Sequence, residues 1–124
     1  MWIFTSQAFL SIVKDRNNPE RRLVRARCEG DIEALFPDAE VFQDPGADYR
    51  YRAFIPAAEV EKRLAEYVQA MDYTNFKNSI PHGKEDYHKA CTWVWTLMQG
   101  LQKPKDEAQK AMSSSQACDE VNIQ

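Results

Sequence analysis

The chain has 124 residues, of which 44% are hydrophobic and 28% are charged, and its formal net charge is -3. This length and apolar content predict one folded domain with a real core, and they exclude a disordered protein. The acidic balance excludes a protein whose whole surface binds nucleic acid, whereas a local basic patch is compatible with it.

The three cysteines, Cys28, Cys91 and Cys118, form no C-x-x-C motif and cannot all pair within one chain. We therefore expect reduced thiols in a cytoplasmic protein. The first residues, MWIFTSQAFLSIV, are apolar, but no basic region precedes them and polar residues interrupt them. They predict a strand and neither a signal peptide nor a membrane span.

The first half of the chain predicts a hairpin followed by a short helix. Residues 2–5 and 9–14 are β-branched and aromatic, the segment DRNNPE predicts a turn, and residues 21–28 predict the partner strand. In that strand Val24, Ala26 and Cys28 share one face, and Leu23, Arg25 and Arg27 share the other. A short helix then begins at Gly30 and Asp31 and ends at Pro37, and its predicted anchors are Ile32, Leu35 and Phe36.

A second hairpin and a long helix follow, and the rest of the chain is organised around them. Pro45 and Gly46 suit the central positions of a type II turn between residues 40–43 and 48–55. Alternation in the second strand places Tyr49, Tyr51, Ala53 and Ile55 towards a core and Arg50, Arg52 and Phe54 on the opposite face. A helix from Pro56 to Met71 is indicated by apolar residues at helical spacing, namely Val60, Leu64, Tyr67, Val68 and Met71.

The last third predicts a short turn of helix, a longer helix and a tail. Asp72 or Thr74 is the expected cap of the short turn, which Pro81 and Gly83 end. Residues 84–101 predict a helix whose inward stripe is Tyr87, Ala90, Cys91, Val94, Leu97, Met98 and Leu101. Trp95 is predicted beside this stripe, and Trp93 on roughly the opposite side of the helix. Residues 102–124 have few anchors and predict a mobile polar tail.

The predicted fold is thus a single α+β domain over residues 1–101. Its element order is ββαββα, and it has a four- to five-stranded antiparallel sheet with helices packed on one face. The orientation predicted for each candidate site residue depends on two hairpins that lie edge to edge in one sheet. The apolar side of this sheet is expected under helices, and its arginine side towards water.

Five segments resemble a group of short bacterial hypothetical proteins: MWIFT at Met1, LVRAR at Leu23, PGADYRYR at Pro45, DYTNFK at Asp72 and YHKACTWVW at Tyr87. The resemblance covers Met1 to about Leu101. It implies a bacterial or phage setting and a cytoplasmic location. No activity, cofactor or catalytic residue is assigned to that group, so the resemblance implies none for these positions.

The first candidate site is a cationic sheet face formed by Arg25, Arg27, Arg50 and Arg52. If both strands belong to one sheet, four guanidinium groups there suit phosphates or carboxylates, and Tyr49 and Tyr51 at an edge add stacking surface. The alternative is a solvated face whose arginines pair with acidic residues across strands, the candidates being Glu40, Asp44 and Asp48.

Catalytic and metal sites have weaker support. Six residues have suitable side chains, namely Asp72, Asn75, Lys77, His82, Asp86 and His88, but their spacing matches no metal or catalytic motif. Capping and packing are the alternative roles. Cys28 and Cys91 are predicted to point inward as inert thiols, and the isolated glycines form no phosphate loop. We expect no cofactor and no metal.

Three aromatic residues, Tyr73, Phe76 and Trp93, are candidates for binding a protein partner, the alternative being burial between the last helix and the preceding connection. Acidic residues also gather in one region and either mimic a phosphate backbone or form a solvated face: Glu29, Asp31, Glu33, Asp38, Glu40, Asp44 and Asp48.

The sequence favours a small non-enzymatic protein-binding protein, regulatory or inhibitor-type, of bacterial or phage origin. Its partner is another protein or a second copy. The alternative is a binding protein or small enzyme for an anionic or phosphate-bearing ligand on the arginine face. Nucleic acid or a nucleotide is compatible with this alternative but not favoured, and no membrane partner is expected.

Overall fold

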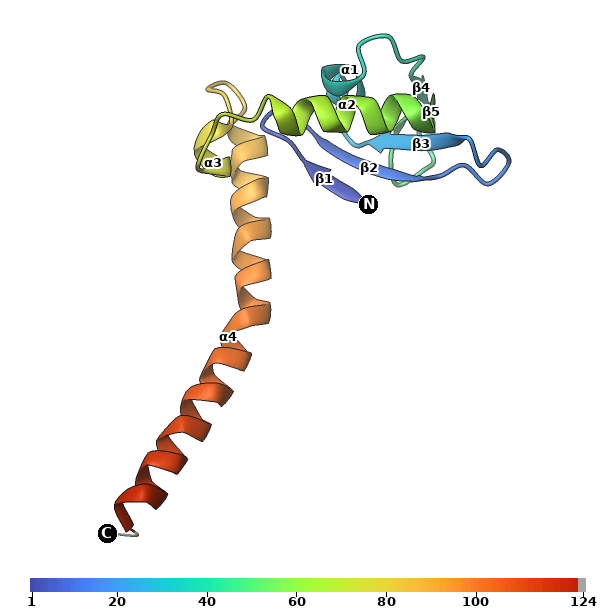
Figure 1. Cartoon of the computed structure of the whole chain (residues 1–124). Coiled ribbons are helices and arrows are strands. Elements are labelled where there is room, and N and C mark those ends of the chain that lie inside the picture. The colour runs from blue at the N-terminus through green and yellow to red at the C-terminus, as the bar shows by residue number, and fades with distance from the viewer. Residues whose placement is uncertain (123–124) are drawn as a thin grey trace. The chain divides into compact units, whose positions relative to one another are not determined.

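Residues 1–122 form a five-stranded antiparallel sheet and four helices, which confirms the predicted α+β class (Figure 1). The strands are β1 Trp2–Phe4, β2 Phe9–Lys14, β3 Arg21–Ala26, β4 Phe42–Gln43 and β5 Tyr51–Pro56, in the sheet order β1-β2-β3-β5-β4. The helices are α1 Asp31–Leu35, α2 Ala57–Gln69, α3 Phe76–Ser79 and α4 Glu85–Asn122.

The computed structural model describes the backbone of residues 1–122 and the side chains of residues 1–103 and 106–114. It divides into two compact units, Met1–Glu85 with the sheet and Asp86–Gln124 with nearly all of α4.

The predicted end of the last helix at Leu101 is wrong, because α4 continues to Asn122. Residues 102–122 lack core anchors, but they are rich in Ala, Lys, Gln and Glu, which favour helix without any core contact. The single domain over residues 1–101 and the mobility of residues 102–124 stay predictions, and residues 123–124 lie outside the described part.

The two predicted hairpins lie in one sheet because β3 pairs with β5. In this pairing Val24 lies opposite Ala53, and Arg25 lies opposite Arg52. Neither arginine is beneath α1 or α2, because the residues next to them in β3 and β5 are the ones that point into the core. The edge-to-edge arrangement on which the sequence interpretation depended is therefore confirmed.

The turn between β2 and β3 is closed by a buried carboxylate. Asp15 Oδ1 accepts the backbone N–H of Asn17 at 3.0 Å, and Asp15 Oδ2 accepts Nε and Nη2 of Arg21 at 2.9 and 2.7 Å. These bonds hold the pKa of Asp15 below its usual value, the Asn17 N–H making the largest contribution.

The turn between β4 and β5 differs from the prediction. The N–H of Ala47 donates to the carbonyl of Asp44 at 3.1 Å, which closes a β-turn around Pro45 and Gly46. Among the described residues the glycines with positive φ are Gly30 and Gly83, so Gly46 does not have the φ that a type II turn requires. The type II prediction is wrong. Asp44 favours a type I turn, since its Oδ1 accepts the N–H of Gly46 at 3.3 Å.

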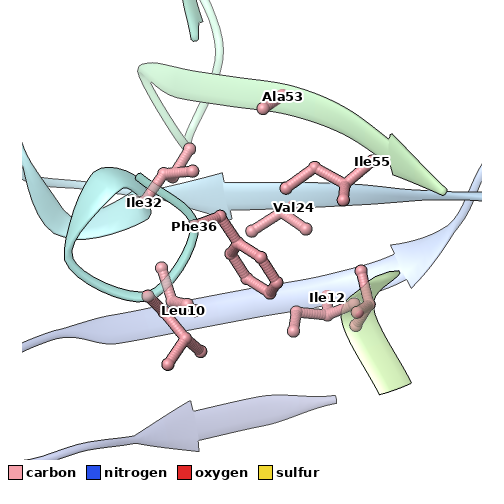
Figure 2. Packing of buried hydrophobic residues seen from close by; sticks show 10 residues of the cluster. Leu10, Ile12, Val24, Ile32, Phe36, Ala53 and Ile55 are labelled. Atoms are coloured by element: carbon pink, nitrogen blue, oxygen red, sulfur yellow. The ribbon is translucent and has the colours of Figure 1, made fainter. Parts of the chain in front are cut away.

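One face of the sheet is packed against α1 and α2 (Figures 1 and 2). Figure 2 shows the ring of Phe36 in the middle of this core, among side chains of Leu10, Ile12 and Val24. The other members are Ala26, Ile32, Leu35, Ala53, Ile55 and Val60. Arg63 of α2 donates from Nε to the carbonyl of Leu35 at 2.9 Å, so the last turn of α1 is bonded to its neighbour.

Three local predictions need correction. Cys28 is exposed and not inward, because β3 ends at Ala26 and the alternation ends with it. The cap of α3 is Asn75, whose side chain accepts the N–H of Asn78 at 3.0 Å, and neither Asp72 nor Thr74 has this role. Val68 and Met71 of the predicted α2 stripe are exposed, and α2 ends at Gln69, before the predicted end at Met71.

Candidate functional site

The sheet face opposite α1 and α2 carries arginine and aromatic side chains, and we call it the open face. Alternation along each strand assigns its members, since their neighbours point into the core. The open face consists of Trp2, Phe4, Phe9, Ser11, Val13, Leu23, Arg25, Phe42, Arg52 and Phe54, together with Arg27 and Tyr49 beyond the strand ends. All of these residues belong to the unit formed by residues 1–85.

Tyr49 contacts three side chains of the open face, although alternation predicted it on the core side. Its ring lies 4.7 Å from the guanidinium carbon of Arg25, 4.4 Å from that of Arg27 and 6.4 Å from the ring of Phe9. Only 4% of its surface is exposed. The prediction failed because β5 begins at Tyr51, so the period of two does not extend back to Tyr49.

Three of the four predicted arginines meet here. Arg25 and Arg52 are opposite one another on β3 and β5, and Arg25 donates from Nη2 to Ser11 Oγ at 2.7 Å. Arg52 donates from Nε to the carbonyl of Tyr49 at 3.0 Å, and Arg27 donates from Nη1 to the carbonyl of Asp48 at 2.9 Å. The Nε of Arg25 is buried and has no hydrogen-bond partner among the described residues.

The fourth predicted arginine is directed elsewhere. Arg50 is exposed and donates from Nε to Gln43 Oε1 at 3.1 Å, and Gln43 pairs with Tyr51, whose side chain packs against the core. Of the acidic residues proposed as pairing partners, Asp48 contacts Arg52, with Oδ1 3.5 Å from Nη2. Within the described chain no ion pair joins an arginine to Glu40 or Asp44. Apart from Arg21, which is paired with Asp15, the open face therefore carries three guanidinium groups against one nearby carboxylate.

Two aromatic clusters flank these arginines. Phe4 and Phe9 are stacked with ring centroids 4.6 Å apart, and Trp2 lies edge-on to Phe9 at 6.1 Å. Phe42 and Phe54 are stacked at 5.7 Å on the other side of the face. The sequence interpretation placed Phe54 on the arginine face but missed the rest. Phe42 was missed because its pairing with Arg52 is a matter of register, which a period of two does not determine.

The guanidinium of Arg21 also lies over an open-face ring, 4.6 Å from the centroid of Phe54. Since Arg21 is paired with Asp15 at 2.7 Å, it adds little net charge to the open face. Trp2 is 70% exposed and Phe54 is 42% exposed. The two clusters thus leave aromatic surface accessible to a ligand.

The second candidate surface is on α4. Leu97, Met98 and Leu101 were predicted to point inward, but they are exposed, Leu97 by 72% and Leu101 by 62%. Trp93 is also exposed, by 64%. Its predicted place opposite the stripe is wrong with respect to Leu97, because residues four apart in α4 share a side of the helix. The prediction failed because spacing shows that apolar residues share a side of a helix, and not that anything covers that side. We call Trp93, Leu97, Met98 and Leu101 the apolar surface of α4.

Tyr73 and Phe76 are half-buried, and their ring centroids are 6.2 Å apart. Tyr73 lines a pocket of about 240 Å³ in the unit formed by residues 1–85. Its other lining residues are Thr5, Ser6, Gln7, Ala34, Leu35, Tyr67, Ala70, Met71 and Asp72. Asp72 is the one carboxylate among these lining residues.

The remaining candidates are dispersed. Among the described residues no group of three His, Cys, Asp or Glu side chains lies close enough to hold a metal ion. Asn75 has the capping role given above, and His82 and His88 are exposed. Cys91 is buried, as predicted, and this burial raises the pKa of its thiol.

The seven acidic residues differ in exposure. Asp31 and Glu33 are half-buried, whereas Glu29, Asp38, Glu40, Asp44 and Asp48 are exposed. Burial raises the pKa of Asp31, although the N–H of Phe9 and the charge of Lys84 oppose the shift. Mimicry of a phosphate backbone by these residues stays a prediction.

Within the part of the chain that the structure describes, none of the helices has the length and apolar character required to span a membrane. In comparisons with protein-family models, with curated proteins and with solved structures, no match to this chain was found.

Proposed function

We propose that the protein is a small non-enzymatic protein-binding protein whose apolar surface on α4 packs against a helix of a partner protein. The observation that carries this proposal is the exposure of Trp93, Leu97, Met98 and Leu101 on one helix. Exposed apolar surface costs free energy in water, and a contiguous patch of large side chains typically marks an interface.

The spacing along α4 favours a helical partner. Apolar side chains recur at intervals of four and three residues at positions 87, 91, 94, 98 and 101, and again at 108 and 112, so Met98 and Leu101 lie on this stripe and Trp93 and Leu97 lie beside it. This is the heptad spacing with which two helices pack side by side.

Residues 90–102 contain no charged side chain, whereas Lys89 and Lys103 flank them. An uncharged core with a charged rim is the usual anatomy of a protein interface. A regulator or inhibitor of a larger bacterial or phage complex fits this arrangement, because such a protein needs a contact surface and no catalytic group. The cytoplasm is the proposed location, and the unpaired thiols of Cys28 and Cys91 support it.

The test compares two double variants that add the same charge to α4. Met98→Glu with Leu101→Glu changes the apolar surface, and Thr96→Glu with Gln99→Glu changes exposed positions on the other side of the helix. Tagged wild-type and variant chains are used to capture proteins from bacterial lysate, with quantification by mass spectrometry. We expect one partner that the wild type and the control retain and that the apolar-surface variant loses.

Capture of the same proteins by all three chains would contradict the proposal. Sedimentation at increasing concentration provides a second measurement. Dimerisation that Met98→Glu with Leu101→Glu abolishes would assign α4 to contact between two copies and would remove the need for a different partner. Trp93→Ala tests the edge of the surface, and we expect it to weaken capture less than the double variant does.

A second candidate function is binding of an anionic or phosphate-bearing ligand by the open face, either as a binding protein or as a small enzyme. It is favoured by the convergence of Arg25, Arg27 and Arg52 around Tyr49, with one carboxylate nearby. Arg27→Gln with Arg52→Gln is expected to abolish binding of inorganic polyphosphate measured by calorimetry. Unchanged polyphosphate binding by this variant would remove the second candidate.

A further inference from the structure

We propose that the open face binds single-stranded nucleic acid, with the arginines contacting phosphates and the aromatic rings stacking on bases. This inference rests on the second candidate function, anion binding at the open face. It is independent of the partner proposed for α4.

The register of the sheet places five side chains of the open face in one row. Trp2 pairs with Ser11, Ser11 with Arg25, Arg25 with Arg52, and Arg52 with Phe42. The row therefore crosses all five strands, with an aromatic ring at each end and two guanidinium groups in the centre. At a strand spacing of about 4.8 Å it is about 19 Å long.

This arrangement matches the chemistry of a single strand. Such a strand alternates charged phosphates with flat bases, and proteins bind it with cationic grooves or sheets on which successive bases stack. Trp2 at one end of the row and Phe42 at the other are both exposed. Each is therefore accessible to a base, while Arg25 and Arg52 are positioned for the phosphates between them.

The arginines are held in place before any ligand arrives. Arg25 bonds Ser11, Arg52 bonds the Tyr49 carbonyl, and Arg25 and Arg27 lie on the Tyr49 ring. These contacts use some of the five N–H groups of each guanidinium, and those that remain suit the oxygens of a phosphate. Fixing the side chains in advance lowers the entropy lost on binding.

Other anions fit the open face less well. A mononucleotide has one base and would use one end of the row. In a duplex the faces of the bases are stacked on each other and cannot reach Trp2 or Phe42. An acidic peptide would pair with the arginines, but it has no flat groups for the rings. Because the whole chain has a net charge of -3, the attraction is local, and we expect binding to weaken steeply with salt.

The experiment measures binding of a fluorescein-labelled oligothymidylate of about 12 nucleotides by fluorescence anisotropy at low ionic strength. Inorganic polyphosphate, measured by calorimetry, reports the charge contribution without bases. The stacking variant is Trp2→Leu with Phe42→Leu, which keeps apolar side chains at both positions. The charge variant is Arg27→Gln with Arg52→Gln. The matched control, Lys62→Gln with Val68→Ala, removes one cation and part of one exposed apolar side chain from α2.

We expect the stacking variant to weaken oligothymidylate binding by about fivefold or more for each ring removed, while its polyphosphate binding stays unchanged. The charge variant should weaken both ligands and reduce the slope of affinity against salt. The control should bind both ligands as the wild type does. Circular dichroism checks that each variant is folded, and Arg27→Gln alone replaces the double charge variant if that one unfolds.

The contrary outcomes distinguish failure of the nucleic-acid inference from failure of anion binding at the open face. If polyphosphate binds through the arginines and oligothymidylate does not bind, the nucleic-acid inference is wrong and anion binding remains. If neither ligand binds, both are wrong. Equal oligothymidylate binding by the wild type and both open-face variants would also overturn the inference. Tighter binding of polyglutamate than of oligothymidylate would do so as well, by assigning the open face to an acidic protein.

Discussion

Replacement of Tyr49 tests whether its ring holds the open face together. Tyr49→Leu keeps a buried apolar side chain but removes the ring from Arg25 and Arg27, whose guanidinium carbons lie 4.7 and 4.4 Å from it. Tyr49→Phe is the matched control, because it removes only the hydroxyl group. The difference between the two variants therefore measures the contribution of the aromatic ring.

The expected loss of unfolding free energy can be estimated from the contacts of the Tyr49 ring. A cation–π contact contributes about 0.5–1 kcal/mol at an exposed site and about 2 kcal/mol when desolvated. Arg27 is exposed and Arg25 is half-buried, and the contact with the Phe9 ring adds about 0.5–1.5 kcal/mol. We therefore expect Tyr49→Leu to lower the free energy of unfolding by about 2–3 kcal/mol, and Tyr49→Phe by less than about 0.5 kcal/mol.

The assay is urea unfolding followed by circular dichroism, with a double-mutant cycle that adds Arg27→Met. We expect a coupling energy between Tyr49 and Arg27 of about 0.5–1 kcal/mol. A coupling energy indistinguishable from zero, or equal stabilities of Tyr49→Leu and Tyr49→Phe, would refute the view that the ring organises these arginines. In that case the buried position of Tyr49 would be a matter of apolar packing alone.

Three further predictions concern the stability of the unit formed by residues 1–85. Phe36→Ala should lower the free energy of unfolding by about 3–5 kcal/mol in urea titrations, because Phe36 is almost fully buried at the centre of the core. Gly30→Ala should lower the free energy of unfolding by about 1–2 kcal/mol in the same titration, because Gly30 has a positive φ of 87°. No atom lies within 4 Å of the added Cβ, so this loss comes from the backbone conformation and not from a clash. An unchanged free energy of unfolding would show that the backbone there relaxes. Asp15→Asn should lower the melting temperature at neutral pH, and its deficit should shrink as the pH falls below 3.8, because the wild type then loses the carboxylate that bonds Asn17 and Arg21. A deficit that stays constant into acid would contradict this role.

Contacts within the protein offset the repulsion between the arginines of the open face. Directly opposed cations such as Arg25 and Arg52 repel each other across a sheet. The Tyr49 ring and carbonyl and the Asp48 carboxylate offset this repulsion. A ligand phosphate would offset it further. We therefore expect an anionic ligand that binds the open face to raise the melting temperature of the wild type more than that of Arg27→Gln with Arg52→Gln.

Much of the fold was predictable from local pattern. Alternation placed Leu23 and Arg25 on one face of their strand and Arg52 and Phe54 on one face of theirs, and helical spacing identified Ile32, Leu35 and Val60 as core anchors of α1 and α2. These predictions succeeded because the side on which a residue lies within a strand or a helix follows from a fixed period of the backbone. Hairpins and short helices were located within a few residues for the same reason.

The candidate sites depended on tertiary structure. The register between strands places Trp2, Arg25, Arg52 and Phe42 in one row, and the start of β5 decides that Tyr49 lies on the open face. Neither register nor strand ends follow from a period of two, because they are set by hydrogen bonds between segments far apart in the chain. Likewise, the spacing of apolar residues on α4 determines which of them share a side, whereas the exposure of Leu97 depends on what packs against that side.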